Sequence, residues 1–306
     1  MAKYILNRLW TSLVTLFALI TIVFFLVRML PGNPFADPKL SPDVKENLFR
    51  YYGLDKPIHV QYAHYIKNLL HGDLGYSLKY RNETINRIIK EAFPYSADLG
   101  IRSVILSTFA SIALGIMAAL KKNSFWDWLC IIIATLGLAI PDFVFGTVMQ
   151  FLFGVKLKIL PVAEWKSFKS TIMPVLTMSI GTIAWMSMMM KASMIDVASQ
   201  DYIKTAKSKG LSQRQIIWKH QIRNAIMPIV TSLGTTVAGI LTGTFIIEQI
   251  FAVPGLGKFF ASGIQNLDYS MVLGLTTFFG AFLIVCNFVV DIVYGFIDPR
   301  IRISEK

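Results

Sequence analysis

Long apolar stretches separated by polar segments dominate the pattern of hydrophobic and polar positions along this chain. A helix needs roughly 20 apolar residues to cross the hydrocarbon core of a bilayer, because each residue adds about 1.5 Å. Backbone polar groups in lipid must be paired within the protein, so these stretches favour helices. Six stretches qualify, at residues 9–30, 97–120, 129–155, 170–193, 228–251 and 271–293. The pattern therefore predicts an all-α membrane protein with six transmembrane helices.

The same pattern divides the chain into regions. We expect a cytoplasmic N-terminus with the first span at 1–30, a large extracytoplasmic loop at 31–96, five further spans within 97–293, and a cytoplasmic tail at 294–306. Inside the large loop, VQYAHYIKNLL has helical spacing with Tyr and Leu on one side. This segment is predicted to form a helix on or near the membrane face.

Positive charge in the loops between spans predicts the orientation, because cytoplasmic loops collect Lys and Arg. With the N-terminus inside, the cytoplasmic side holds the polar segment 194–227 and seven further basic residues: Lys3, Arg8, Lys121, Lys122, Arg300, Arg302 and Lys306. On the other side, loop 252–270 holds only Lys258, although loop 156–169 carries four lysines against the trend. The balance predicts an N-in, C-in arrangement.

Composition supports the membrane class and narrows the partners. Hydrophobic residues make up 54% of the chain and charged residues 16%, whereas a soluble domain averages about 25% charged. The net charge of +12 does not indicate nucleic acid, because a basic patch needs a water-facing module. Membrane lipid is instead an expected partner. Neither the two cysteines nor the four histidines have metal-ligand spacing, so no metal site is predicted.

The polar segment contains DYIKTAKSKGLSQRQIIWKHQIRNAIMP at 201–228, with six Lys or Arg residues against one acid. Gly210 is expected to separate two short helices. Leu211, Trp218 and Ile222 fall on one stripe of the second helix. The segment therefore predicts a cytoplasmic helix–turn–helix that lies across the membrane. From these residues alone, binding to anionic lipid and docking of a cytoplasmic partner are both open.

A family resemblance favours the second interpretation. The segment resembles the E-A-A-x-x-x-G loop of permease subunits of ATP-binding-cassette (ABC) importers, with Lys204 in place of the family's glutamate. Residues that match the peptide and nickel branch are Thr205, Ala206, Gly210, His220, Arg223, Asn224, Ala225 and Pro228. YGLDKPIHVQY, HGDLGYS, GTFIIEQIFAVPGLGKFF and VDIVYGFIDPRIR resemble other parts of that branch. The resemblance covers nearly the whole chain and is strongest to oligopeptide permeases, the first of two membrane subunits.

This resemblance implies a function and a set of partners. The chain would form half of a peptide pathway in the bacterial cytoplasmic membrane, with a second homologous permease, two ABC ATPases and an extracytoplasmic solute-binding protein. Residues implied to dock on an ATPase are Lys204, Thr205, Ala206, Gly210, Leu211, Arg214 and Trp218. ATP and magnesium would be bound by the ATPases, and this chain would bind no cofactor.

The segment AVPGLGKF at 252–259 is a poor match to a P-loop. Ala252 stands in place of the first glycine, and Phe259 stands in place of the Ser or Thr.

Asp142 and Glu248 are acidic residues well inside predicted spans, where an ionisable side chain is costly. Asp142 follows Pro141, which is expected to kink the third span, and for Asp142 a pathway role and a structural role are equally open. Glu248 near the outer end of the fifth span is a candidate gate residue, although snorkelling to the interface is the favoured interpretation. Gly239 and Gly243 form a G-x-x-x-G pair that would permit close helix packing.

Other functions remain as alternatives. Within the same family the solute could be nickel or another small molecule. From a different class, the chain could be a self-contained channel or secondary transporter, but few ionisable residues lie in the spans and no inverted repeat is evident. An enzyme is disfavoured, because no intramembrane cluster of Ser, His and acid has useful spacing.

Overall fold

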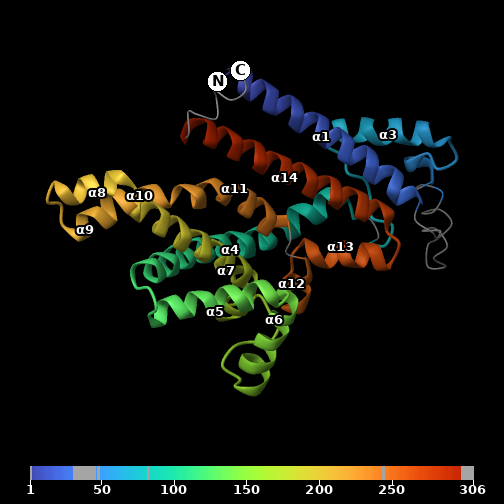
Figure 1. Cartoon of the computed structure of the whole chain (residues 1–306). Helices are drawn as coiled ribbons and strands as arrows, with labels where there is room; N and C mark the ends of the chain where they lie inside the picture. Colours follow the sequence, from blue (N-terminus) through green and yellow to red (C-terminus); the bar gives the residue numbers. More distant parts are fainter. Residues whose placement is uncertain (1, 30–45, 47–48, 81–82, 243–244, 298–306) are drawn as a thin grey trace. The chain divides into compact units, whose positions relative to one another are not determined.

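The computed structural model describes residues 2–29, 46, 49–80, 83–242 and 245–297. The helices are α1 (Ala2–Met29), α3 (Ile58–Leu70), α4 (Ile85–Leu120), α5 (Phe125–Ala139), α6 (Asp142–Met149), η1 (Gln150–Lys156), α7 (Phe168–Ala198), α8 (Asp201–Ser208), α9 (Gln213–Gln215), η2 (Ile216–Gln221), α10 (Ile222–Ala225), α11 (Met227–Thr242), α12 (Phe245–Ile250), α13 (Leu256–Gln265) and α14 (Tyr269–Ile297), as shown in Figure 1. Over these ranges there is no strand beyond one isolated bridge, Tyr76 to Thr84. The all-α prediction is confirmed.

Four helices are each long and apolar enough to cross a membrane: Ile5–Met29, Ile85–Leu120, Phe168–Ala198 and Tyr269–Val290. Two bent helix pairs also qualify if each pair counts as one span. The first joins Phe125–Ala139 to Asp142–Lys156 at 108°, and the second joins Gln213–Ala225 to Met227–Leu241 at 42°. The described residues therefore provide four to six spans, and the number six and the orientation stay predictions.

The third predicted span, 129–155, is not one continuous helix. α5 ends at Ala139, Ile140 is extended with φ −96° and ψ 120°, and α6 begins after Pro141. A residue before proline is pushed out of the helical region, and proline cannot donate to the helical ladder. The expected kink is thus a sharp break, and the chain then continues through the π-helix η1.

The second predicted span, 97–120, is the later part of a longer helix. α4 begins at Ile85, within the region predicted to be loop. Its first turns carry charged residues and Pro94, which is why the hydrophobic pattern places the start too late. Arg87 pairs with Glu91 at 2.8 Å and with Glu83 at 3.6 Å, so these charges stabilise the helical start.

The chain consists of two compact units. Unit 1 comprises Met1–Ser96 and Pro254–Lys306, and unit 2 comprises Ala97–Val253, with the boundary inside α4. The last predicted span, within α14, therefore groups with α1 and not with the other spans expected inside 97–293. The reason is packing, because α14 lies beside α1 along its length (Figure 1).

In unit 1, α3 covers the pair formed by α1 and α14. The Tyr62 hydroxyl lies 2.6 Å from Thr21 Oγ1 of α1, and the Tyr65 hydroxyl lies 2.9 Å from Thr277 Oγ1 of α14. The Phe24 ring, 1% exposed, contacts both tyrosine rings. The helix predicted in the large loop is confirmed, and its tyrosines face other helices of the protein.

A buried carboxylate joins two further segments of unit 1. Asp268, 1% exposed, accepts from Ser77 Oγ at 2.5 Å and from the backbone N–H groups of Leu78 and Lys79 at 3.1 and 3.2 Å. Its other oxygen accepts from Met271 N at 3.0 Å, in the first turn of α14. Nearby, burial raises the pKa of Tyr52 to about 12. One side chain thus ties residues 77–79 to the start of α14.

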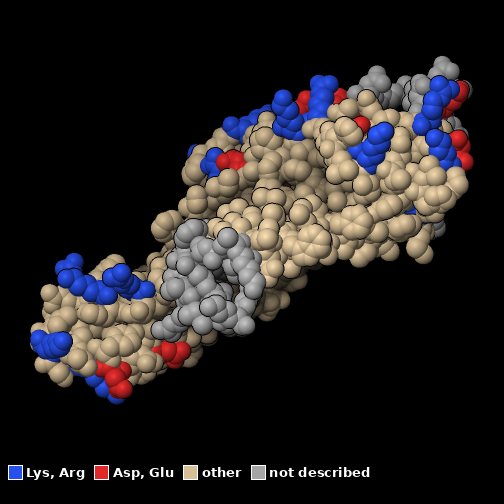
Figure 2. Space-filling view, turned by 90° about the horizontal axis from the view of Figure 1, so that it is seen from above, with Lys and Arg blue, Asp and Glu red and all other residues tan. Residues whose placement is uncertain are grey.

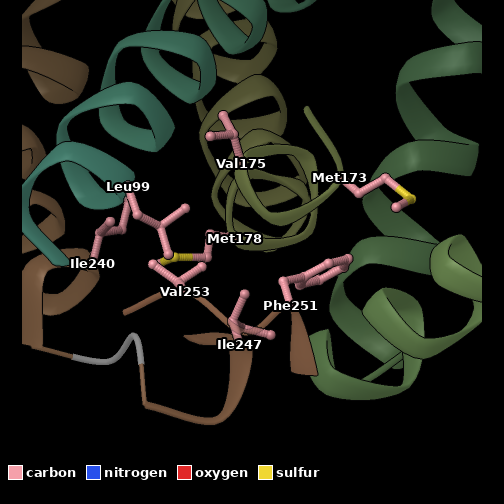
Figure 3. Close-up of a cluster of buried hydrophobic side chains, with 8 residues drawn as sticks. All are labelled: Leu99, Met173, Val175, Met178, Ile240, Ile247, Phe251 and Val253. Carbon is pink, nitrogen blue, oxygen red and sulfur yellow. The ribbon is translucent and has the colours of Figure 1, made fainter. Parts of the chain in front are cut away.

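In unit 2, glycines allow α4, α5 and α7 to pack closely. A Cβ on Gly115 of α4 would lie 2.6 Å from Met190 Cβ of α7, and one on Gly137 of α5 would lie 2.8 Å from Ala184 Cβ. A cluster of buried side chains comes from α4, α7, α11, α12 and the turn that follows α12 (Figure 3). Its members are Leu99, Met173, Val175, Met178, Ile240, Ile247, Phe251 and Val253.

Candidate coupling site

Residues 201–225 form a bent pair of short helical arms, named here the elbow. Its first arm, α8, ends in a Schellman motif, in which a residue with positive φ reverses the chain after the last turn. Gly210 has φ +77°, its N–H donates to Lys207 O at 2.9 Å, and Leu211 N donates to Ala206 O at 3.3 Å. A left-handed φ favours glycine, so the predicted turn at Gly210 is confirmed.

The second arm begins with a capping box. Ser212 Oγ accepts from Gln215 N at 3.4 Å, and the Gln215 side chain accepts from Ser212 N at 3.0 Å. The arm continues as α9, the π-helix η2 and α10. In η2 the buried residues are Ile216 and Gln221, five positions apart, as the i to i+5 pattern of a π-helix predicts.

The π-helix changes which side chains face inward. Trp218 is 65% exposed, so the predicted stripe of Leu211, Trp218 and Ile222 is wrong for the tryptophan. The stripe assumes α-helical spacing, whereas η2 winds more widely and turns Trp218 toward the surface. Ile216 occupies the inward position instead, with 1% exposure.

The elbow has a small core of its own. Ile203, Ala206 and Ile216 are buried together, and Val197 and Leu211 pack against them. Ala206, which the family resemblance implies in docking, therefore lies between the two arms. Its small side chain lets them approach, and it has little surface for a partner. Ala206, Gly210 and Leu211 shape the elbow.

Exposed residues of the elbow form its outer surface. Of the predicted docking residues, Lys204, Thr205, Gly210, Arg214 and Trp218 are exposed. Lys204 Nζ lies 2.8 Å from Asp201 Oδ1, and both side chains are well exposed to solvent. Figure 2 shows Lys and Arg side chains gathered over the end of unit 2 that carries α8 and α9, at the lower left. The surface is suited to a partner with an acidic rim and a pocket for an aromatic ring.

The elbow packs against the rest of unit 2 through methionines of α7. Met186, Met190 and Met194 are buried with Ala225 of α10 and Ile229 of α11. Met is adaptable and fills irregular gaps, so this contact tolerates small displacements without opening a cavity. The last turns of α7 are therefore packed against the end of the elbow and the start of α11.

Asp142 and Glu248, the candidate pathway residues, differ in their environment. Asp142 is exposed at the first turn of α6, and a Cβ on Gly181 of α7 would lie 3.4 Å from its Oδ1. Glu248 in α12 is 1% exposed. The favoured interpretation that Glu248 snorkels to the interface is therefore wrong. Roles of either residue in a pathway stay predictions.

Several residues with structural roles at this site escaped the sequence pattern. Gln150 in η1 donates to Val162 O at 2.8 Å and to Ile250 O at 2.6 Å, which joins three segments far apart in sequence. Asp127 in α5 pairs with Lys191 in α7 at 2.5 Å. A charged residue near the end of an apolar stretch was the available signal for Asp127 and Lys191, but it does not identify the partner.

The P-loop-like segment is a turn followed by a helix, as predicted. Ala252 has φ +51°, and α13 begins at Leu256. The Leu256 N–H donates to the buried Ser96 Oγ at 3.0 Å. The backbone there is therefore engaged within unit 1.

Comparison with known proteins identifies the family. Residues 111–303 match the model of the binding-protein-dependent transport system inner membrane component, and residues 1–100 match its N-terminal counterpart. The dipeptide transport system permease protein DppB of Bacillus subtilis is 40% identical over 307 residues, all of both chains. The oligopeptide transport system permease proteins OppB of Haemophilus influenzae and Escherichia coli K12 are 41% and 40% identical over 305 residues, 99% of this chain and 100% of theirs.

These matches run from one end of the chain to the other and agree with its apolar helices, four of which could each cross a membrane alone. The chain therefore belongs to the family of binding-protein-dependent transport system inner membrane components, as a multi-pass membrane permease subunit that is not itself an enzyme.

Proposed function

We propose that this chain forms half of the translocation pathway of an ATP-driven importer of peptides, with oligopeptides as the main solutes. A second homologous permease completes the pathway, two ABC ATPases bind on the cytoplasmic side, and an extracytoplasmic solute-binding protein delivers the peptide. The ATPases bind ATP and magnesium. In this proposal the chain is N-in and C-in with six spans, and the elbow is cytoplasmic.

The observation that carries the proposal is full-length similarity, at about 40% identity, to relatives named as dipeptide and oligopeptide permeases. Both names specify a peptide solute, so peptide is the class of solute proposed here. The uptake experiment described below ranks dipeptides against longer peptides.

The form of the elbow supports its proposed docking on an ATPase. It presents an exposed aromatic side chain and basic residues on a folded core of its own. Basic residues steer association with an acidic partner surface, and a rigid helical arm transmits displacement. When ATP closes the ATPase pair, the elbow moves with its binding site and shifts the permease between two arrangements.

Peptide uptake by a bacterial strain that lacks this chain tests the solute. Expression of the chain with its partners should restore uptake of labelled oligopeptides, and competition with dipeptides and with nickel ranks the solutes. Uptake of nickel without uptake of any peptide would assign the chain to the alternative solute.

Paired tryptophan variants test the docking surface. Trp218→Ala should weaken co-purification of the ATPase with the tagged complex, because an exposed aromatic residue at the centre of an interface often contributes most of the affinity. Trp128→Ala is the matched control, since Trp128 is 60% exposed on α5 and lies outside the elbow. Equal ATPase recovery from both variants would contradict docking through Trp218.

Reconstitution separates the importer from a self-contained transporter. Liposomes that contain the whole complex should accumulate peptide only with ATP inside. Accumulation by this chain alone, without ATP, would reject the importer in favour of a channel or secondary transporter.

A further inference from the structure

Unit 2 holds a buried ion pair that the proposed docking does not use. Lys191 Nζ of α7 lies 2.5 Å from Asp127 Oδ1 of α5, and the side chains are 15% and 11% exposed. The second carboxylate oxygen of Asp127 accepts from Asn123 N at 3.0 Å, in the turn between α4 and α5. Both oxygens of Asp127 are therefore engaged, one by each neighbouring element.

One residue of the pair, Lys191, lies in sequence within the part of α7 that packs against the elbow. Lys191 directly follows Met190, which is buried with Met194, Ala225 and Ile229 at the attachment of α10 and α11. The last turns of α7 thus contact the elbow on one side and α5 on another. These turns are therefore the part of α7 that contacts both the elbow and α5.

Close packing alone does not make α5 follow α7. Contact at Gly137 and Ala184 keeps the helices from moving closer, because a single added Cβ would lie 2.8 Å from Ala184 Cβ. Apolar contact is not directional, so it resists sliding and rotation weakly. An ion pair with hydrogen bonds to fixed partners restrains both movements.

We propose that Asp127 and Lys191 form a joint that makes α5 and the α4–α5 turn move with α7 when the elbow is displaced. Both are positioning residues, since they act on the pathway through helices. The inference rests on the proposed function, in which the elbow is driven by an ATPase. Its alternative is that the pair only stabilises the fold.

Replacing both charges separates the two roles. A buried ion pair can often be exchanged for uncharged residues without loss of stability, whereas removal of one partner leaves an unpaired buried charge. Asp127→Asn with Lys191→Met keeps an acceptor for Asn123 N and a side chain of similar length, and it leaves no charge. This neutral double variant should assemble with its partners at the wild-type level.

The main experiment measures peptide imported and ATP hydrolysed by the full complex in liposomes. The neutral double variant should hydrolyse ATP and import about tenfold less peptide per ATP, a fall within the usual range of coupling between distant sites. Lys191→Arg, which keeps the charge, should retain most of the wild-type ratio. Arg102→Met is the matched control, because it breaks an ion pair with Asp98 at 2.7 Å that lies within α4 alone. Its ratio should equal that of the wild type.

Spin labels give a readout that does not depend on the solute. Labels on Ile132→Cys of α5 and Ala192→Cys of α7, both exposed positions, report the separation of the two helices. In the otherwise unchanged complex this separation should be the same with and without trapped ATP. In the neutral double variant it should change between the two states.

Either measurement can overturn the joint. A wild-type ratio of peptide to ATP in the neutral double variant, or an unchanged label separation there, contradicts it. Failure of that variant to assemble assigns the pair to folding alone and also contradicts it. A wild-type complex that hydrolyses ATP but imports no peptide contradicts the proposed solute instead, and the label separation then decides the joint.

Discussion

Asp268 in unit 1 and Asp127 in unit 2 are both buried aspartates, and they are held in different ways. Asp268 accepts from the Ser77 hydroxyl and from three backbone N–H groups, all close to the segments that it joins. Asp127 accepts from one backbone N–H group and pairs with the side chain of Lys191 on another long helix.

The difference shows how one residue type serves two purposes. Backbone donors are positioned by the fold, so the network of Asp268 fixes one arrangement of residues 77–79 against α14. The Asp127 pair joins side chains of two long helices, so in the joint proposed above it makes α5 and α7 move together. We therefore predict that unit 1 is more rigid around Asp268 than unit 2 is around Asp127. In unit 2, the helices that Asp127 and Lys191 join are predicted to move with the elbow.

Breaking the Asp268 network should give the largest effect. Asp268→Ala removes the acceptor of four hydrogen bonds, and each buried donor left unpaired costs about 1–3 kcal/mol. We expect a loss of at least about 3 kcal/mol in the free energy of unfolding. Chemical denaturation of the detergent-purified complex measures it. Asp268→Asn keeps one acceptor oxygen and should lose less stability than Asp268→Ala. If Asp268→Ala lost no more stability than Asp268→Asn, the network would be shown to be unimportant.

A substitution at the close crossing of α4 and α7 in unit 2 should give the next largest loss of stability. Gly115→Ala places a Cβ 2.6 Å from Met190 Cβ and 2.7 Å from Ser187 O, so the helices must separate. Overpacking of this kind costs about 1–3 kcal/mol. Gly239→Ala is the matched control, because nothing lies within 4 Å of its Cβ position.

The same control also tests the predicted G-x-x-x-G pair. Among the described residues, no atom lies within 4 Å of a Cβ built on Gly239, so an added methyl group has space there, and Gly243 lies outside the described residues. Gly239→Ala should leave thermal stability unchanged or raise it by about 0.5–1 kcal/mol. A loss equal to that of Gly115→Ala would place a second helix, from a partner, against Gly239.

A substitution at Gly210, in the turn of the elbow, should act through backbone conformation alone. Gly210 has φ +77° and open space around its Cβ position, so a larger side chain meets no atom but strains the backbone by about 1–2 kcal/mol. Gly210→Val should therefore uncouple peptide uptake from ATP hydrolysis while the complex still assembles. Gly210→Asn should retain more uptake, because Asn tolerates this conformation. Identical uptake in the two variants would mean that the turn has no role in coupling.

An exposed charge on the elbow should give the smallest effect on stability. Lys204→Gln removes an ion pair with Asp201 that is open to solvent, and such pairs contribute about 0–1 kcal/mol. Unfolding should be nearly unchanged, while ATPase recovery at raised salt falls. A large change in unfolding instead would give Lys204 a structural role.

Local chemistry determined part of this structure from the sequence alone. The apolar stretches are long enough for membrane helices, so the all-α class follows from composition and spacing. Gly210 was predicted at a turn because few other residues adopt its φ without strain. A helix in the large loop was predicted from the spacing of Tyr62 and Tyr65, which indeed face Phe24.

Contacts between distant segments decided the rest. The inward side of the second elbow arm depends on the π-helix η2, so α-helical spacing misplaced Trp218. Ala206 is a predicted coupling residue, and its packing against Ile216 depends on how the two arms fold together. The pairing of Asp127 with Lys191, and the burial of Glu248, depend on how helices pack across the fold. Spacing along one helix determines which face a residue occupies, but only the packed structure determines what covers that face.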